Sequence, residues 1–285
     1  MPRVTAARSE NRPKPKLGQH FLTDSGAAVE IVAALGDVSN RTVLEIGAGR
    51  GVLTTLLARR ARRLIAIELD RVLAAQLRMQ FSQTSNVEII EGDALAIEFE
   101  SVLGPKPGST RPGLELDLEP VRVVGNIPYY ITSELLLRLF EVRQHVESMV
   151  LMVQREVADR LAAAPGKSDY GLLSATAQLY SRVEKLFSLP PDAFSPPPKV
   201  HSAVVRLTME PRLERLQVPE REFVDFLKLS FGQKRKTITN NLKSLYTPRA
   251  LESALRQAGI KPSMRAEALS LEKSAALFRA LRNGN

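Results

Sequence analysis

Short β-rich segments alternate with helical segments along the first half of the chain, and this alternation constrains the fold more than any other feature. The β-rich segments are residues 41–46, 64–68, 87–90, 121–124 and 148–153. Apolar residues at helical spacing follow three of them, at residues 52–61, 70–81 and 134–140. An earlier helix is expected at 24–35, with Asp24 or Ser25 as its cap. Strands that alternate with helices form a parallel sheet covered on both faces, so we predict an α/β fold.

Three other stretches differ from this body in composition. Residues 1–16 are polar, basic and contain three prolines, which is typical of a flexible arm. Residues 96–120 are rich in proline and glycine, and we predict a mobile surface insertion there. Near the C-terminus, apolar residues recur at helical spacing, namely Phe223, Phe226, Leu227, Phe231, Ile238, Leu242 and Leu245. The predicted organisation is a basic arm at 1–16, an α/β domain at 17–209 and a small helical domain at 210–285.

The composition excludes several classes of site. The chain has no cysteine, which rules out disulfides, cysteine nucleophiles and thiolate metal sites. Its three histidines, His20, His145 and His201, lie far apart and in no ligand-spaced motif, so we expect no metal. No apolar run reaches membrane-spanning length, and no apolar core follows the basic N-terminal residues. We therefore expect a cytoplasmic protein.

Positive charge is concentrated at the two ends of the chain. The net charge is +9, of which residues 1–20 carry +4 and residues 201–285 carry +8, so the middle carries −3. A near-neutral body between basic ends favours a catalytic unit whose extensions bind a polyanion. A basic protein without such a partner is the alternative, but the asymmetry favours nucleic acid.

A glycine-rich turn, E-I-G-A-G-R-G at residues 45–51, follows the first predicted strand and opens a helix. Glycines let backbone amides approach a ligand closely, and a helix N-terminus adds positive potential. Glu68 ends the second predicted strand, where doubly wound folds place an acid that binds ribose hydroxyls. Asp93 follows the third strand, where it can accept from an adenine amino group. Each acid could instead be a helix cap, but three such features at consecutive strand ends predict a cofactor site.

Residues 126–132, N-I-P-Y-Y-I-T, lie between the fourth predicted strand and the next helix, where open α/β sheets bind ligands. The amide of Asn126 can accept a hydrogen bond from the exocyclic amine of a base. Pro128 holds Ile127 extended, which presents the Ile127 carbonyl. Tyr129 offers a flat face on which a base can stack. Asparagine and proline also form ordinary turns, but together with the other motifs this loop indicates a reaction at the exocyclic amine of a base.

Together these motifs resemble those of the class I S-adenosylmethionine-dependent methyltransferases. Three more narrow the resemblance to the ribosomal RNA adenine dimethyltransferases: G-Q-H-F-L at residues 18–22, F-S-P-P-P-K-V-H-S-A-V-V-R-L at 194–207 and F-G-Q-K-R-K-T-I at 231–238. The chain most resembles the small-subunit branch of that family, KsgA/RsmA, from about residue 16 to the C-terminus. The resemblance implies a Rossmann-like parallel-sheet domain followed by a small C-terminal α-helical domain.

The resemblance also implies site residues. Those expected to bind S-adenosylmethionine are Gln19, His20, Leu22, Gly47, Gly49, Glu68, Asp93, Ala94 and Asn126. Those expected to hold the target adenine are Asn126, Ile127, Pro128 and Tyr129, with Phe194 covering the second face of the base. A core position is the alternative for Phe194, because phenylalanine is often buried. Candidates for phosphate contacts are Lys14, Lys16, Lys199, Lys234, Arg235 and Lys236.

The implied reaction is dimethylation of N6 of two adjacent adenosines near the 3′ end of 16S rRNA, in the small ribosomal subunit or its precursor. A role in ribosome biogenesis and a monomeric state go with it. Two alternatives remain open. One is a resistance-type 23S rRNA adenine dimethyltransferase, and the other is a small-subunit assembly factor that keeps the fold without its chemistry. The lysine-arginine motif at 231–238 and the form of residues 18–22 favour the small-subunit branch.

Overall fold

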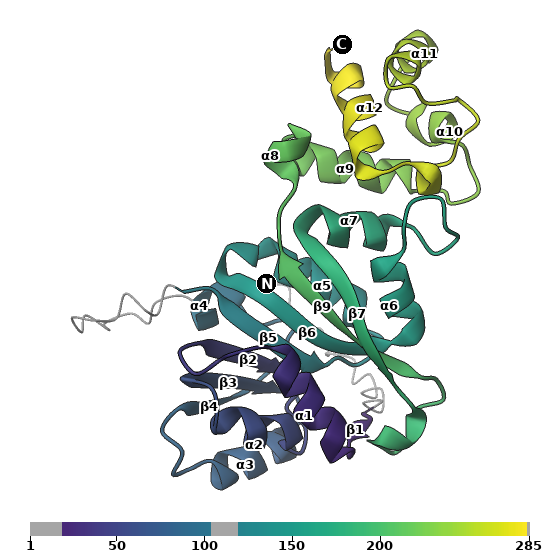
Figure 1. Ribbon diagram of the computed structural model, residues 1–285. Helices are drawn as coiled ribbons and strands as arrows, with labels where there is room; N and C mark the ends of the chain where they lie inside the picture. The colour runs from purple at the N-terminus through teal and green to yellow at the C-terminus, as the bar shows by residue number, and fades with distance from the viewer. Residues whose placement is uncertain (1–18, 104–118, 284–285) are drawn as a thin grey trace, which may run out of the picture.

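The computed structural model describes residues 19–103 and 119–283. The predicted basic arm, with Lys14 and Lys16, lies outside this part, as does most of the predicted insertion at 96–120. The α/β body occupies the lower part of the molecule in Figure 1, and the C-terminal helices lie above it. None of the described helices is both long enough and apolar enough to cross a membrane.

One seven-stranded sheet forms the centre of the body. Its strands, in spatial order, are β4 (Val87–Glu91), β3 (Arg63–Glu68), β2 (Thr42–Ile46), β5 (Val121–Asn126), β6 (Val146–Gln154), β9 (Ser202–Met209) and β7 (Ser181–Leu189). The first five are parallel and correspond to the five predicted strands, so the predicted α/β class is confirmed. Strand β9 is antiparallel to both of its neighbours. Neither β7 nor β9 was predicted from the sequence.

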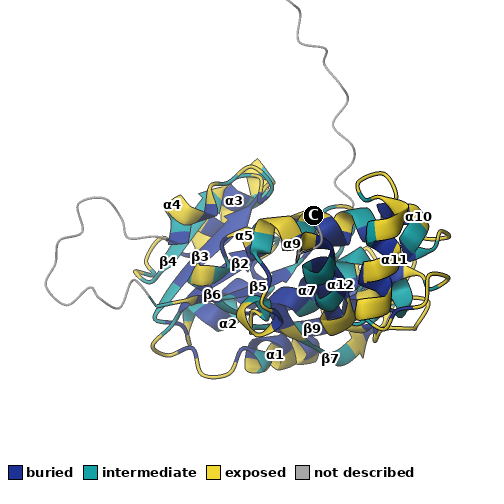
Figure 2. Ribbon diagram, turned by 90° about the horizontal axis from the view of Figure 1, so that it is seen from above, coloured by how far each residue is buried: buried dark blue, intermediate teal, exposed yellow. Residues whose placement is uncertain are grey.

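Helices cover both faces of the sheet (Figure 2). One face carries α1 (Ser25–Ala34), α2 (Val52–Ala58) and α3 (Arg71–Gln80). The other carries α4 (Phe99–Leu103), α5 (Thr132–Glu141), α6 (Arg155–Ala162) and α7 (Leu172–Tyr180). Successive strand residues point to opposite faces, so on β3 Leu64 packs in the first layer and Ile65 in the second. The predicted cap of α1 is present, because Asp24 Oδ1 accepts from the Ala27 backbone N–H at 3.0 Å.

A separate two-stranded sheet joins two distant parts of the chain. Strand β1 (Phe21–Leu22) pairs antiparallel with β8 (Phe194–Ser195), so that Phe21 faces Ser195. His20 Nδ1 lies 2.7 Å from the carbonyl oxygen of Pro196 and extends the connection. Residues 20–22 and the segment that begins at Phe194 are therefore held together as one structural unit.

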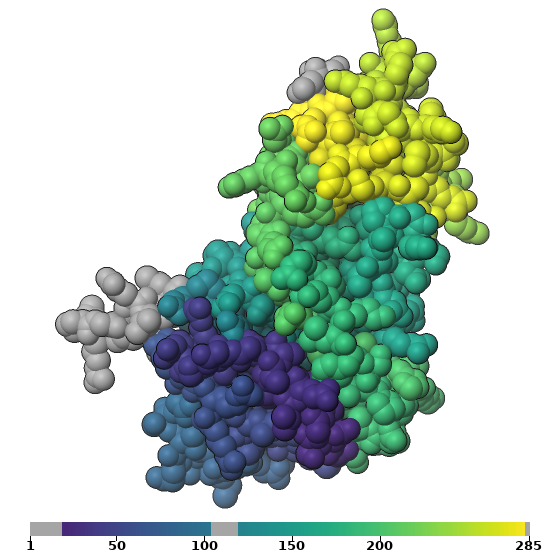
Figure 3. Space-filling view, in the orientation of Figure 1, coloured from purple at the N-terminus to yellow at the C-terminus, as the bar shows by residue number. Residues whose placement is uncertain are grey.

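The C-terminal helices are α8 (Leu213–Leu216), α9 (Glu220–Ser230), α10 (Ile238–Leu242), α11 (Pro248–Gln257) and α12 (Leu271–Asn283). They pack around aromatic rings, with the ring centre of Phe278 5.5 Å from those of Phe223 and Phe226. These residues belong to the same hydrophobic cluster as one face of the sheet, and Figure 3 shows the helices seated directly on the body. Leu245, one of the apolar residues predicted at helical spacing, lies outside the helices and is 69% exposed, because it follows the last turn of α10. The boundary at 209/210 remains a prediction.

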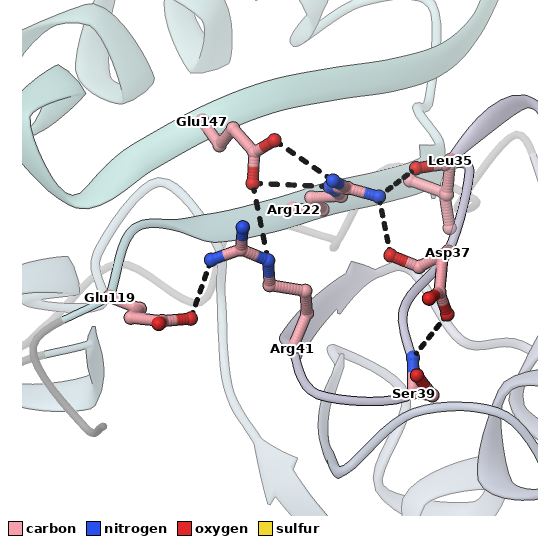
Figure 4. A network of polar contacts seen from close by, with 7 residues as sticks. All are labelled: Leu35, Asp37, Ser39, Arg41, Glu119, Arg122 and Glu147. Carbon is pink, nitrogen blue, oxygen red and sulfur yellow. Dashed lines mark hydrogen bonds and ion pairs between the residues drawn. The ribbon is translucent and has the colours of Figure 1, made fainter.

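A network of charged side chains braces the N-terminal ends of the central strands (Figure 4). Arg122 on β5 donates to both carboxylate oxygens of Glu147 on β6, at 3.2 and 2.9 Å, and to two backbone carbonyls in the loop after α1. Arg41, just before β2, pairs with Glu119 and Glu147. Bidentate arginine–carboxylate contacts of this kind fix geometry well. The opposite, C-terminal ends of the same strands carry the candidate site.

Candidate functional site

A cavity of about 150 Å³ opens at the C-terminal ends of β2, β3, β4 and β5. Strand β2 pairs with β3 on one side and β5 on the other, so the cavity lies where the strand order reverses, the usual ligand position in open α/β sheets. Predicted residues that line it are Gln19, His20, Gly47, Gly49, Glu68, Asp93, Ala94, Asn126, Ile127, Pro128 and Tyr129. Sequence reasoning did not single out Ile67, Leu69, Leu95 and Tyr130, which line it as well.

The glycine turn after β2 forms one wall. Gly47 and Gly49 have φ angles of 76° and 57°, a left-handed conformation that favours glycine. A Cβ atom on Gly47 would lie 3.3 Å from the carbonyl oxygen of Asn126, and one on Gly49 would lie 3.1 Å from the Phe21 ring. The turn is therefore both conformationally restricted and closely packed, so its backbone faces the cavity directly.

Glu68 lies at the end of β3 with only 3% of its surface exposed. Its Oε2 accepts from the Gly49 backbone N–H at 2.7 Å, and its Oε1 accepts from the Asp70 backbone N–H at 2.8 Å. These bonds orient the carboxylate at the cavity wall. Asp93, at the end of the neighbouring strand, is exposed, and its Oδ1 accepts from the Leu95 N–H at 2.8 Å. Both acids therefore border the cavity from consecutive strands, as predicted from their spacing.

Asn126 ends β5 and is held by the N-terminal segment. Its Nδ2 donates to the His20 carbonyl oxygen at 2.7 Å. Ile127 is 1% exposed, and its backbone N–H donates to the Met152 carbonyl at 3.2 Å. The Pro128 carbonyl accepts from the Ile131 N–H at 3.1 Å, which closes the turn into α5. The loop thus has a defined conformation at the mouth of the cavity.

Tyr129 is fixed by two contacts. Its hydroxyl lies 2.8 Å from Ser202 Oγ, and its ring stacks on His20 with centres 6.0 Å apart. Ser202 is 1% exposed and begins β9. Ser202 belongs to the motif at residues 194–207, but its role could not be predicted from the sequence, because its partner Tyr129 lies 73 residues away along the chain.

Phe194 and Leu22 do not line the cavity. Phe194 is 3% exposed and Leu22 is 5% exposed, and both pack in the hydrophobic cluster beneath α1. The pairing of β1 with β8 turns both side chains inward. The structure thus corresponds to the core alternative for Phe194, since no face of its ring is open to a base in this conformation. It also places Leu22 behind the cavity wall.

Glu45, the first residue of the glycine motif, is buried. Only 1% of its surface is exposed, and its Oε2 has no hydrogen-bond partner. Burial raises the pKa of this carboxyl to about 8, and the nearby charge of Glu68 adds to the shift. The acid of the motif is therefore a neutral group behind the glycine turn.

The predicted phosphate-binding side chains that the structure describes do not line the cavity. Lys199 is exposed in the segment between β8 and β9. Lys234, Arg235 and Lys236 are exposed in the loop between α9 and α10, where Lys234 Nζ donates to the Ser168 carbonyl at 3.0 Å. Within residues 19–103 and 119–283, no group of three or more metal-ligating side chains is close enough to hold a metal ion.

Comparisons with known proteins agree with this geometry. The family model described as ribosomal RNA adenine dimethylase matches residues 10–283. The chain is 55% identical, over the full length of both chains, to a ribosomal RNA small subunit methyltransferase A of Koribacter versatilis. It is 52% identical to the protein of that name from Acidobacterium capsulatum, over 96% of this chain and 93% of the relative.

Solved structures are similar over nearly the whole chain. A dimethyladenosine transferase from Plasmodium falciparum matches with a TM-score of 0.74 and 27% identity, over 90% of this chain and 96% of that one. The 23S rRNA methyltransferase ErmE matches with a TM-score of 0.67 and 29% identity, over 92% and 99%. The glycine turn, in which added Cβ atoms would crowd the wall, and the buried carboxylate of Glu68 fit a nucleoside cofactor. The chain therefore belongs to the ribosomal RNA adenine dimethylase family and is an S-adenosylmethionine-dependent rRNA adenine dimethyltransferase.

Proposed function

We propose that this enzyme dimethylates N6 of two adjacent adenosines near the 3′ end of 16S rRNA, in the small ribosomal subunit or its precursor in the cytoplasm. The name of its relatives, ribosomal RNA small subunit methyltransferase A, supports the choice of subunit. The observation that carries the chemistry is the pair of acceptors at the end of β5. Asn126, the last residue of β5, and Ile127, the next residue, both line the cavity, and the Asn126 amide nitrogen is engaged by the His20 carbonyl.

The cofactor side of the cavity is the wall formed by the ends of β2, β3 and β4. S-adenosylmethionine, when bound, supplies a methyl group activated by a sulfonium charge. Glu68 would accept hydrogen bonds from ribose hydroxyls, and the two backbone N–H groups that orient its carboxylate at the cavity wall support this role. Asp93, which also lines the cavity, would accept from the adenine amino group. Gly47 and Gly49 allow the ligand to approach the backbone.

The target adenine is proposed to enter beside Asn126. Its N6 lone pair is delocalised into the ring, so acceptors on its two hydrogens favour a more tetrahedral nitrogen and free the lone pair. Asn126 Oδ1 and the Ile127 carbonyl would hold this nitrogen so that its lone pair faces the methyl group that bound S-adenosylmethionine would supply, and one N6 proton would be released to solvent. Alignment dominates such a transfer, and no strong base is required. Tyr129 stacks on the base, which has to leave its own stack to enter.

RNA affinity is proposed to come from basic side chains outside the cavity. Lys199 and the group Lys234, Arg235 and Lys236 are exposed and can approach phosphates. Phosphate contacts release counterions, so affinity falls as salt rises. Because these residues lie on both the α/β body and the C-terminal helices, the two parts would bind RNA together. We propose that the enzyme acts as a monomer and contributes to ribosome biogenesis.

One experiment distinguishes the proposed function from two alternative functions. The similarity to the 23S rRNA methyltransferase ErmE supports methylation of large-subunit RNA as one alternative. The other alternative is a non-catalytic assembly factor, which would bind small subunits without transferring a methyl group. Labelled methyl from S-adenosylmethionine is offered to unmethylated small subunits and, separately, to large-subunit RNA, and the products are mapped by nuclease digestion and mass spectrometry. Dimethyladenosine in the small-subunit 3′ region alone is expected. Label in large-subunit RNA only, or tight subunit binding without label, would overturn the proposal.

A further inference from the structure

Tyr130 differs from the other aromatic residues of the described chain. It is 66% exposed, and it is the single aromatic among the large hydrophobic residues that are exposed there. It follows Tyr129 directly and lines the same cavity. Tyr129 is held by Ser202 and His20, whereas Tyr130 makes no hydrogen bond or ring contact to another described residue. Most of the Tyr130 side chain is therefore open to solvent in the described protein.

The position of Tyr130, more than its exposure, points to a ligand, because isolated exposed apolar residues are common on protein surfaces. Tyr130 lies on the β5 side of the cavity, in the loop that carries Asn126 and its acceptor oxygen. The other exposed apolar residue of the lining, Leu69, follows Glu68 at the end of β3, on the cofactor side. The exposed ring is thus located where RNA, and not the cofactor, would pass.

The chemistry of the substrate supplies a use for this ring. When one of two adjacent purines leaves its stack and enters the cavity, the neighbouring base loses a stacking partner. Aromatic side chains replace such partners in proteins that bind single strands, and they accept any base because every base has a π-face. We propose that Tyr130 is the stacking platform for the purine adjacent to the adenosine in the cavity.

This inference rests on the proposed function, since it assumes an RNA in which two purines are neighbours. The two tyrosines then have separate roles. Tyr129, which is held by Ser202 and His20, would stack on the adenine that reacts. Tyr130 would stack on the adjacent purine outside the cavity.

Substitutions at Tyr130 test the role of the ring. Tyr130→Ala is expected to lower kcat/KM for subunit methylation by about 5- to 100-fold, the range for loss of one base–aromatic stack. Tyr130→Phe keeps the ring, so its kcat/KM is expected to stay near the wild-type value. Tyr130→Leu keeps only the bulk of the side chain, so its kcat/KM is expected to fall as far as that of the alanine variant. Leu137→Ala, at a 45% exposed position on α5, is the matched control. Leucine as active as tyrosine, or alanine as active as wild type, would overturn the proposal.

A second measurement does not depend on methyl transfer. A single-stranded RNA with 2-aminopurine next to an adenosine is titrated with enzyme, and fluorescence reports whether the analogue stacks. Quenching by wild type and Tyr130→Phe that is absent with Tyr130→Ala is expected, and equal quenching by all three would overturn the stacking role. Failure of wild type to methylate subunits would count against the proposed function alone. Normal methylation and unchanged quenching in the alanine variant would count against this inference alone.

Discussion

Asn126 Nδ2 donates a 2.7 Å hydrogen bond to the backbone carbonyl of His20, and this bond decides which end of the amide faces a ligand. A carbonyl oxygen can only accept, so the nitrogen of the amide has to point toward His20. Oδ1 is then the end left to accept from a base amine. A residue of β5 is therefore oriented by the N-terminal segment, 106 positions earlier in the chain.

Replacement of Asn126 by alanine should abolish most methyl transfer. The substitution removes a pre-oriented acceptor from the reacting nitrogen, a loss that costs about 10²- to 10³-fold in kcat in comparable sites. RNA affinity should stay nearly unchanged, because the basic side chains are elsewhere. Single-turnover transfer and filter binding with the same RNA measure the two quantities. Equal loss of rate and affinity would contradict the assigned role.

The hydrogen bond between Tyr129 and Ser202 should couple the two residues in catalysis. Tyr129→Phe and Ser202→Ala each remove this bond, whose net contribution is about 0.5–1.5 kcal/mol. Each should lower kcat by about 2- to 10-fold with little effect on cofactor affinity, and the double variant should be no worse than the poorer single variant. Ser202→Thr, which keeps a hydroxyl, should restore part of the rate. Additive losses in the double-mutant cycle would show that the bond is not the shared cause.

Glu68→Gln should weaken cofactor binding. The amide would turn one N–H donor toward a site where two backbone N–H groups and the ribose hydroxyls all require acceptors. Loss of charged hydrogen bonds of about 1.5–3 kcal/mol predicts affinity for S-adenosylmethionine about 10- to 100-fold lower by calorimetry. Glu91→Gln is the matched control, since Glu91 ends the neighbouring strand and pairs with Arg78 outside the cavity. Comparable weakening by both variants would contradict a specific role for Glu68.

Glu45 should make the folded protein less stable at alkaline pH. Its pKa is raised from 4.5 to about 8, so between these values the unfolded chain releases a proton that the folded protein retains. Stability therefore falls as the pH rises from about 5 to about 8, and no penalty remains below about pH 4. Glu45→Gln should remove this contribution and gain stability relative to wild type as pH rises. Urea unfolding of both proteins across this range measures it, and parallel pH profiles would exclude the effect.

Gly125→Ala should destabilise the protein strongly. A Cβ at this position would lie 2.5 Å from the Ile46 carbonyl oxygen and 2.9 Å from the Ile127 side chain, inside the central sheet. Overpacking of this kind costs about 1–3 kcal/mol or more. Gly171→Ala is the control, since a Cβ there meets nothing within 4 Å. Thermal unfolding of the two variants should separate them clearly, and equal midpoints would contradict the packing argument.

The sequence predicted the five parallel strands because each is a short apolar run followed by a helix or a turn, a local signal. It did not predict β7 and β9. Strand β7 is exposed at several positions and shifts register between Lys185 and Phe187, so its alternation is broken. The site residues likewise fall into those with a local sequence signal and those without one. Spacing along the chain predicted Glu68 and Asp93 from strand ends, whereas the bond of Ser202 to Tyr129 and the burial of Phe194 depend on pairing between distant segments.

Strand β9 is the last strand in the chain, yet it lies inside the sheet, between β6 and β7. During synthesis, β7 emerges from the ribosome before the strand that it has to pair with, and it cannot join the sheet until β9 arrives. A nascent chain that ends before Ser202 leaves the edge of β6 open, and it also lacks the hydroxyl that holds Tyr129. Open strand edges invite pairing with other chains. Synthesis of β9 therefore completes both the sheet and the base-binding loop, late in the folding of the enzyme.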